Sequence, residues 1–277
     1  MYAVDLFGHT VVRTPDRTLR TPEFPGVKPR QILELIALGR GEPVLKTMIA
    51  DRIWNGRPPA KWPITLESYV ALLRRAVQPG VPGRSTVLRT TPGGYRLDVD
   101  RVTLDLHVFD RLVRTAAAAP AGLALPMWER AVQLAAEPLL AGEPYAGWAA
   151  EARRQQDDCV LAAALRGAET ALGLGQPERA VPLARRATEL SPLAEHGWQL
   201  LIQGLVATGR RAEAVRAFHA CRSALRRDLG LDPGPTTVQL FEQTLSDRAP
   251  APVRPAPLPA PAGVAPLQVA VPWVVGL

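Results

Sequence analysis

The stretch ITLESYVALLRRAV, residues 64–77, decides how the rest of this chain is interpreted. Its apolar residues recur at i, i+4, i+7 and i+11, the spacing that aligns side chains along one face of an α-helix. These positions are Leu66, Val70, Leu73 and Val77. Pro63 suits the first turn of such a helix, and Pro79-Gly80 ends the pattern. The sequence therefore predicts a helix of about four turns with one face turned toward a core.

The opposite face of this helix carries a mixture of small, acidic and basic residues. They are Glu67, Ser68, Ala71, Arg74 and Arg75. One interpretation is a solvated face whose arginines complement the negative end of the helix dipole. The other is a contact surface for an acidic partner. The helix by itself does not decide between them.

The distribution of charge along the chain favours the second interpretation. The 277 residues hold 33 Lys and Arg against 26 Asp and Glu. Residues 1–104 hold 16 basic and 9 acidic residues, whereas residues 105–277 hold 17 of each. The whole excess of +7 thus lies in the first part, which indicates an anionic polymer or surface as its partner. A solubility charge helped by codon bias is the alternative, because 30 of the 33 cations are arginine.

Composition also bounds the class of protein. The length and the 47% hydrophobic content allow two domains. The sequence has no long apolar run and no signal-peptide order at its start, so we expect a cytoplasmic protein without membrane contact. Cys159 and Cys221 lie far apart in helical patterns and are interpreted as small buried hydrophobes.

The sequence gives little support to an enzyme. Its four histidines, His9, His107, His196 and His219, do not stand at metal-ligand spacing with cysteines or carboxylates. A phosphate-binding G-x-x-x-x-G-K-[ST] motif is also missing. We therefore expect no catalytic residues, no cofactor and no metal.

The first hundred residues alternate between strand-like and helix-like patterns. Short strands are predicted within residues 3–12 and 17–20, followed by helices at 28–38 and 45–54 and then the helix at 64–77. Two β-prone runs, 86–90 and 95–99, flank Pro92-Gly93-Gly94 and predict a hairpin. The order of strands, three helices and hairpin predicts a winged helix-turn-helix domain over residues 1–103.

From residue 104 to residue 247 the pattern is helical almost throughout. Helices are predicted at about 105–118, 124–136, 148–173, 177–190, 194–208, 211–228 and 235–246. LGLGQPERAV (172–181) recurs as VATGRRAEAV (206–215), which places Gly175 over Gly209 and Ala180 over Ala214 at an offset of 34 residues. This period is typical of tetratricopeptide-like helix pairs, which make protein contacts.

The last part, residues 248–277, is proline-rich. It has 8 prolines in residues 249–277 and no helical period, so we expect it to be extended or disordered. Its apolar end, VAVPWVVGL, could dock on a partner or on the body of the protein, or could be a passive end.

Four motifs make the chain similar to a known family. They are DRIW (51–54) followed by Pro58-Pro59, TLESYVALLRRAV (65–77), TPGGYRLDVD (91–100) and LGLDPGP (229–235). Over about residues 3–247 the chain resembles the Streptomyces antibiotic regulatory proteins. The resemblance implies a mainly α fold with a smaller α+β domain. An OmpR-type winged helix-turn-helix would be followed by a tetratricopeptide-like bacterial transcriptional activation domain at 104–247.

The same resemblance implies a function and its partners. Members of this family are sequence-specific DNA-binding activators of antibiotic and other secondary-metabolite gene clusters. They usually bind as pairs to direct repeats in promoter DNA and recruit RNA polymerase holoenzyme, through its sigma, alpha or beta subunits. The rival hypothesis is a tetratricopeptide-type adaptor whose winged helix no longer reads DNA sequence.

Carried onto this sequence, the resemblance places the helix at 64–77 in the major groove and the hairpin in the adjoining minor groove. The implied DNA contacts are Lys61, Thr65, Glu67, Ser68, Ala71, Leu72, Arg74, Arg75, Arg89, Thr91 and Arg96. Phosphate contacts are expected from Lys61, Arg75, Arg89 and Arg96, because a cation there fixes register without reading sequence. Arg74 would contact bases or backbone, and Thr65 could donate to a phosphate.

Two positions depart from the pattern of the family. Ala71-Leu72 stands where Ser-Arg is common, and Thr91 stands where the hairpin usually offers an arginine. Base readout is therefore expected to use fewer polar groups, which is the feature that favours the adaptor. Leu72 could touch a thymine methyl group, pack on a neighbouring protomer, or stay half exposed.

Overall fold

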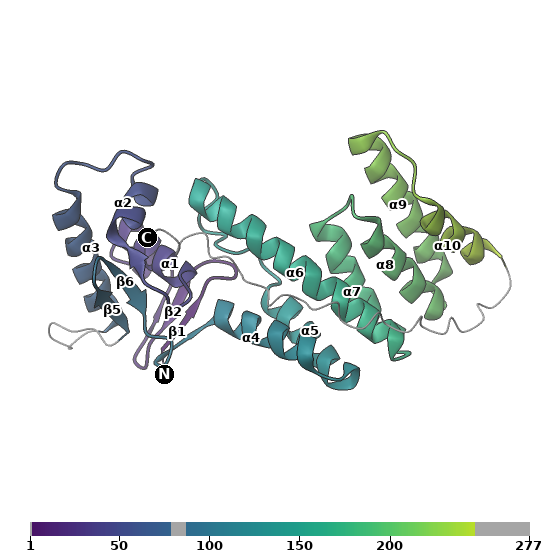
Figure 1. Cartoon of the computed structure of the whole chain (residues 1–277), viewed down its shortest axis with the longest axis horizontal. Helices are drawn as coiled ribbons and strands as arrows, with labels where there is room; N and C mark the ends of the chain where they lie inside the picture. Colours follow the sequence, from purple (N-terminus) through teal and green to yellow (C-terminus); the bar gives the residue numbers. More distant parts are fainter. Residues whose placement is uncertain (1, 79–86, 247–277) are drawn as a thin grey trace. The chain divides into compact units, whose positions relative to one another are not determined.

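The computed structural model describes residues 2–78 and 87–246 (Figure 1). The elements of its first part are β1 (Tyr2–Asp5), β2 (Val11–Arg13), β3 (Thr18–Leu19), η1 (Thr21–Glu23), α1 (Val27–Leu38), β4 (Val44–Leu45), α2 (Lys46–Ile53), α3 (Trp62–Val77), β5 (Leu88–Thr91), β6 (Gly94–Leu97) and β7 (Val102–Leu104). The helices that follow are α4 (Asp105–Ala118), α5 (Ala121–Leu134), α6 (Gly147–Gly173), α7 (Pro177–Leu190), α8 (Glu195–Ala207), α9 (Arg211–Leu229) and α10 (Pro235–Leu245). The predicted mainly α fold, with its early strands, three helices and hairpin, is confirmed.

Two small sheets organise the first part of the chain. The four-stranded sheet has the order β3-β2-β1-β7, with β1 antiparallel to β2 and parallel to β7. The three-stranded sheet has the order β4-β6-β5 and is antiparallel. The strand β7 was not predicted from the sequence. It pairs Val102 with Tyr2, which lies at the other end of this part of the sequence, so no local pattern could predict the pairing.

The helices α1, α2 and α3 and the hairpin share one core. The apolar stripe predicted for α3 is buried, and it meets side chains from α1, α2, β5 and β6. The fully buried residues of these elements include Ile32, Ile36, Ile49, Leu66, Leu73 and Leu97. Burial of this stripe on several neighbours holds α3 rigidly and leaves its opposite face exposed.

The hairpin turn depends on glycine. Pro92 and Gly93 form the two central residues between β5 and β6, and Gly93 has a φ of +74°. A proline followed by a residue with positive φ is the pattern of a type II turn. At Gly94 an added Cβ would lie 2.3 Å from the carbonyl oxygen of Val44, so β4 can approach β6 only if this residue has no side chain.

The chain folds as two compact units, and the first is not one continuous stretch. In addition to residues up to Asp110, it contains Leu134–Arg154 from the helical part. Phe7 forms a β-bridge with Leu139. The backbone N–H of Leu140 donates to the carbonyl of Leu6 at 2.8 Å. The chain segment before α6 therefore extends the hydrogen bonding of β1.

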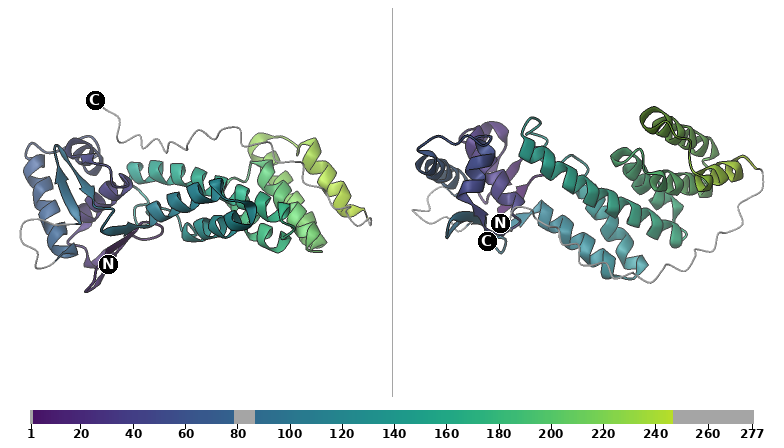
Figure 2. Two further views of the ribbon diagram at one scale, coloured as in Figure 1. Left: turned by 60° about the horizontal axis from the view of Figure 1, so that its bottom comes forward. Right: turned by 45° about the horizontal axis from the view of Figure 1, so that its top comes forward.

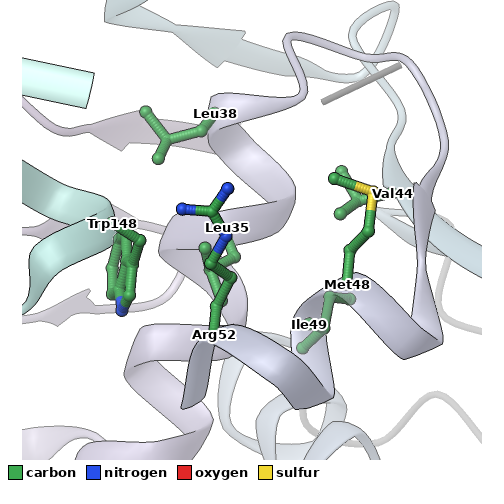
Figure 3. A pocket seen from close by; sticks show the side chains of 7 residues that line it. All are labelled: Leu35, Leu38, Val44, Met48, Ile49, Arg52 and Trp148. Carbon is green, nitrogen blue, oxygen red and sulfur yellow. The ribbon is translucent and has the colours of Figure 1, made fainter. Parts of the chain in front are cut away.

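Trp148, from the beginning of α6, completes the core of the first unit. It lines a small pocket together with Leu35 and Leu38 of α1 and with Met48 and Arg52 of α2 (Figure 3). The cavity volume is about 20 Å³, roughly the room of one water molecule. The pocket is therefore a packing gap beneath an aromatic anchor, far smaller than a site for a small-molecule ligand.

A buried polar cluster also joins residues 134–154 to α1. Arg30 forms ion pairs with Glu34, at 3.4 Å, and with Glu143. The Thr10 hydroxyl donates to Glu34 at 2.5 Å. Burial, together with the nearby Glu143 charge, raises the pKa of Glu34 to about 7 despite the Thr10 hydrogen bond and the Arg30 charge.

Asp105 is a second buried carboxylate of this unit. Its Oδ2 accepts the backbone N–H groups of Leu6 at 2.6 Å and Phe7 at 2.8 Å, and its Oδ1 accepts that of Leu106 at 2.8 Å. Burial raises its pKa to about 6, although these hydrogen bonds act in the opposite direction. Asp105 thus fixes the turn after β1 to the start of α4.

The second unit contains the stacked helices α7 to α10 (Figure 2). Gly175 and Gly209, aligned by the 34-residue repeat, have positive φ values of 68° and 73°. Each stands in the turn before the helix that repeats, α7 or α9. The aligned Ala180 and Ala214 are both buried, with exposures of 0% and 1%, so small residues mark equivalent crossings as the repeat predicted.

The LGLDPGP motif lies between α9 and α10, and two carboxylates hold it in place: Asp232 of the motif itself and Glu195 at the start of α8. Asp232 accepts hydrogen bonds from Arg226 at 2.8 and 3.0 Å and pairs with Arg222 at 3.2 Å. Glu195 accepts the backbone N–H of Gly234 at 2.9 Å and the hydroxyl of Thr237. The Glu195 carboxylate thus accepts the N–H of the N-cap residue and lies at the N-terminus of α10, where the helix dipole favours a negative charge.

Three further expectations concern single residues or segments. Cys221 is buried, as predicted, and burial raises the pKa of its thiol to about 11. Cys159 is only partly buried. Within residues 2–78 and 87–246, no helix combines the length and the apolar character needed to cross a bilayer. The expectation for residues 248–277 lies outside the described residues, as does the predicted Pro79-Gly80 boundary.

Candidate nucleic-acid interface

The outer face of α3 is the candidate interface. We name the line of Ile64, Ser68, Ala71 and Arg75 the outer stripe of α3; all four residues are exposed. Each of these residues comes two positions before a member of the buried stripe. Two positions are slightly more than half a helical turn, so the two stripes lie on opposite sides of the helix. Ser68 and Ala71 are small, which leaves the middle of the outer stripe open to close approach.

Lys61 and Arg75 mark the two ends of this face. Lys61 is the N-cap residue of α3, and Arg75 lies in its last turn; both side chains are exposed. Within the part of the chain that the structure describes, neither side chain has an ion-pair or hydrogen-bond partner. Both cations are therefore available to an anionic ligand.

Glu67 is paired with a lysine that the sequence did not single out. Lys46, at the start of α2, donates to the Glu67 carboxylate at 2.7 Å. This hydrogen bond raises the pKa of Lys46. The ammonium group also lies 5.5 Å from the centre of the Tyr95 ring. The charge of Glu67 is thereby offset, and its carboxylate is held toward α2 and the hairpin.

Arg74 lies against the hairpin. Its guanidinium donates to the carbonyl oxygen of Leu88, at 3.2 Å from Nε and 2.9 Å from Nη2, and to the Thr90 hydroxyl at 2.8 Å. Its Cζ atom is 5.9 Å from the centre of the Tyr95 ring. These contacts join α3 to the hairpin and take up donors that were expected to reach DNA.

The hairpin presents its own cations on one side. Arg89 and Arg96 are directly opposed across β5 and β6, where like charges repel. Asp98 offsets this repulsion through an ion pair with Arg89, and it also lies 3.5 Å from Arg101. Arg96 is half exposed and, within the described residues, its guanidinium has no ion-pair partner. Arg96 is consequently a freer phosphate candidate than Arg89.

Two hydroxyl groups of the predicted site donate to carbonyl oxygens of α3 and of its N-cap residue. Thr65 donates to the carbonyl of Lys61 at 3.2 Å, and Ser68 donates to that of Ile64 at 2.9 Å. Thr91 is half buried at the end of β5, opposite Gly94. Leu72 is 39% exposed on the flank of the outer stripe, so it is available for contact without being fully solvated.

The structure brings the predicted residues of α3 and of the hairpin into one neighbourhood through the Arg74 contacts. It leaves Ile64, Ser68 and Ala71 of the outer stripe at the surface, together with the cations Lys61, Arg75 and Arg96. Sequence reasoning missed Lys46, Tyr95 and Ile64. The outward place of Ile64 follows from its helical phase, two residues before Leu66, and was available from the sequence. The roles of Lys46 and Tyr95 depend on tertiary contacts.

Comparisons with known proteins match the helical part of the chain to a family profile and most of the chain to related proteins. Residues 104–245 match the family profile described as the Bacterial transcriptional activator domain. The chain is 31% identical to regulatory protein DnrI of Streptomyces peucetius over 220 residues, which cover 74% of this chain and 79% of DnrI. It is 29% identical to transcriptional regulator RedD of Streptomyces coelicolor over 75% of this chain and 61% of RedD.

A solved structure of a related protein has a similar fold. The chain is similar to Mycobacterium tuberculosis EmbR, in complex with a low-affinity phosphopeptide, with a TM-score of 0.69 and 26% identity. The similarity covers 88% of this chain and 65% of the EmbR chain. The family of these relatives consists of transcriptional regulators. The chain belongs to the Streptomyces antibiotic regulatory proteins, the family of transcriptional activators that carry the bacterial transcriptional activator domain.

Proposed function

We propose that this protein is a sequence-specific DNA-binding activator of an antibiotic or other secondary-metabolite gene cluster. Its first unit would act as an OmpR-type winged helix-turn-helix domain. The observation that carries this proposal is the outer face of α3, which is open in its middle and bounded by the exposed Lys61 and Arg75. It lies in the part of the chain that holds the whole excess of +7.

The dimensions of α3 suit the major groove. An α-helix with side chains is about 10–12 Å across, close to the groove width of about 12 Å. With α3 in the groove, Lys61 and Arg75 would contact phosphates. Arg96 on β6 would contact the backbone near the adjoining minor groove. These contacts position the protein and release counterions without reading the sequence.

The helical part would provide the contact with RNA polymerase. Residues 105–277 hold 17 basic and 17 acidic residues, so this part has no net charge that would favour DNA. Its stacked helices α7 to α10 form the kind of surface on which helical repeats bind proteins. Two copies of the protein on direct repeats would then present this surface to the sigma, alpha or beta subunits of the holoenzyme.

A salt titration tests DNA binding. The full chain is titrated against promoter duplex DNA that carries direct repeats, at several salt concentrations. Contact with about five phosphates should give a slope of log K against log salt of roughly −4 to −5. Two shifted bands, with the second at higher protein concentration, are expected if a pair of molecules occupies the repeats.

The adaptor hypothesis keeps some support from the structure. Glu67, Arg74 and Arg89 all have protein partners, which leaves fewer polar groups for reading bases. An adaptor would bind the promoter duplex weakly or not at all, and its affinity would not distinguish repeats from scrambled DNA. The same titration with a scrambled duplex therefore separates the two functions.

Polymerase recruitment is tested with the full chain bound to its promoter. Adding RNA polymerase holoenzyme should give a larger complex on the promoter DNA and more transcript in a purified system. A protein that binds the repeats but neither retains the holoenzyme nor raises transcription would contradict recruitment and leave DNA binding intact.

A further inference from the structure

We infer that α3 reads the major groove by contact with thymine methyl groups, through Ile64 and Ala71 with Leu72 on the flank, in place of arginine–guanine hydrogen bonds. This inference rests on the proposed function, because it takes α3 as the element that enters the groove. It names the class of operator that this chain would select: sites whose contacted major-groove positions are thymines.

Four polar side chains of α3 already have hydrogen-bond partners within the protein. The Glu67 carboxylate accepts a hydrogen bond from Lys46, and the Arg74 guanidinium donates to the hairpin. The hydroxyls of Thr65 and Ser68 donate to carbonyls of their own helix. Reading a base with Glu67 or Arg74 would require breaking contacts that also hold α3 to α2 and to the hairpin.

The two cations that have no partner within the described residues lie at opposite ends of α3. Lys61 and Arg75 are separated by 14 residues along α3, about 21 Å at 1.5 Å per residue. This separation exceeds the width of the major groove, about 12 Å. Where α3 crosses the groove, both cations would lie over the phosphate walls, and the residues between them would face the bases. In helix-turn-helix domains the N-terminal residues of this helix meet the base edges, so Ile64 in the first turn would lie nearest to them, with Ala71 and Leu72 further along the groove.

Three residues of α3 that would face the bases are apolar. Ile64 is 67% exposed and Leu72 is 39% exposed, and Ala71 lies between them in sequence with its methyl group free. Exposed apolar surface gains free energy when it leaves water. Among the base edges of the major groove, the thymine C5-methyl is the apolar group, and alanine or a similar side chain is its usual partner.

The alternative occupant of this surface is a second protein molecule. The flanking cations argue for DNA, because Lys61 and Arg75 lie at both ends of the apolar residues and have no acidic partner within the described residues. A second copy of this face would bring these cations against each other. Charge complementarity therefore favours a polyanion.

The experiment begins with selection of binding sites by the full chain from random duplex DNA. Each thymine of the selected site is then replaced by uracil, which removes only the methyl group, and the dissociation constant is measured at fixed salt. We expect a loss of about fourfold for each contacted methyl, the fold-change that corresponds to one buried methylene-sized group. The Ile64→Ala variant should bind the thymine and uracil duplexes at the contacted position with nearly equal affinity.

A matched control keeps the test specific. Val27→Ala shortens another exposed apolar residue of the first unit, at the start of α1, with 57% exposure. This variant should retain the full preference for thymine. Circular dichroism of both variants shows whether they are folded, and Ile64 is exposed enough for the substitution to leave the core intact.

Three results would overturn the inference, and they can be told apart. If uracil is tolerated while 7-deazaguanine at selected guanines weakens binding, the readout is by arginine or lysine on guanine. If Ile64→Ala changes self-association in sedimentation but leaves the thymine preference unchanged, the face binds protein. If no duplex is selected and none is bound at low salt, the proposed function itself fails together with the inference.

Discussion

A single residue, Arg74, links α3 to the hairpin. Its three hydrogen bonds end on Leu88 and Thr90, and its guanidinium lies beside Tyr95. Direct contact of Arg74 with DNA bases or the DNA backbone stays a prediction. The geometry assigns it a positioning role that acts through the hairpin.

Replacing Arg74 distinguishes the two roles. Arg74→Ala should lower the free energy of unfolding by about 1–2 kcal/mol, because a partly exposed charged donor loses several hydrogen bonds. DNA affinity should fall with it, and Arg74→Lys should restore little because lysine lacks the forked geometry. The measurement is urea unfolding beside DNA titration. Unchanged stability with a loss of 1–3 kcal/mol in specific binding would instead mark Arg74 as a direct contact.

Glu34 gives the first unit a pH-dependent stability. Burial raises its pKa from 4.5 to about 7, so between these values the folded chain holds a proton that the unfolded chain has released. The free energy of unfolding should therefore fall as pH rises from about 4.5 to about 7, by up to about 1 kcal/mol per pH unit. Asp105, raised to about 6, acts in the same direction.

The contribution of Glu34 is isolated by comparing the wild type with Glu34→Gln. The variant keeps the shape of the side chain beside Thr10, Arg30 and Glu143 but cannot titrate. Urea unfolding at intervals between pH 4.5 and pH 7.5 should show a shallower fall of stability in the variant. Parallel curves would show that Glu34 is ionised in the folded protein throughout this range.

Glu195 shows how one residue organises an element. Its carboxylate accepts the N–H of Gly234 and the Thr237 hydroxyl, so it caps α10 from the start of α8. Glu195→Ala should destabilise α10 by about 1 kcal/mol, the usual cost of a lost cap. Faster amide hydrogen exchange in α10 is the readout. Glu178→Ala, in the first turn of α7 and exposed, should leave exchange in α10 unchanged.

At the same scale, the helices were predictable and part of the site was not. The apolar periodicity placed α3 and α6 to α10 within a few residues of their observed ends, because each helix buries one stripe. The strand β7 was not predicted, because its partner Tyr2 is remote in sequence. The exposed face of α3 followed from helical phase. The pairing of Glu67 with Lys46 and the turn of Arg74 toward Leu88 arise from tertiary packing and leave no local signal.

At the scale of the molecule, the first unit needs residues from the helical part. Trp148 is only 4% exposed and packs against α1 and α2, and Glu143 pairs with Arg30. A regulator assembled in this way has a first unit whose stability depends on residues within the bacterial transcriptional activator domain.

Trp148→Ala tests this dependence. The substitution should cost about 3–5 kcal/mol, as is usual for a buried tryptophan, and should speed amide exchange in α1 and α2. DNA affinity should fall although Trp148 lies outside the proposed interface. Tyr145→Ala is the matched control, since that ring is 98% exposed in the same segment. Equal stability of the two variants would show that residues 134–154 are dispensable to the first unit.

We propose that the exposed face of α3 binds duplex DNA through the cations at its two ends, Lys61 and Arg75. The most direct test is the salt dependence of DNA binding by the full chain and by the double variant Lys61→Ala, Arg75→Ala. Each lost phosphate contact lowers the salt slope by about 1, so the double variant should show a slope smaller by about 2 and weaker binding to all sequences. Identical slopes and affinities for the two proteins would contradict the claim.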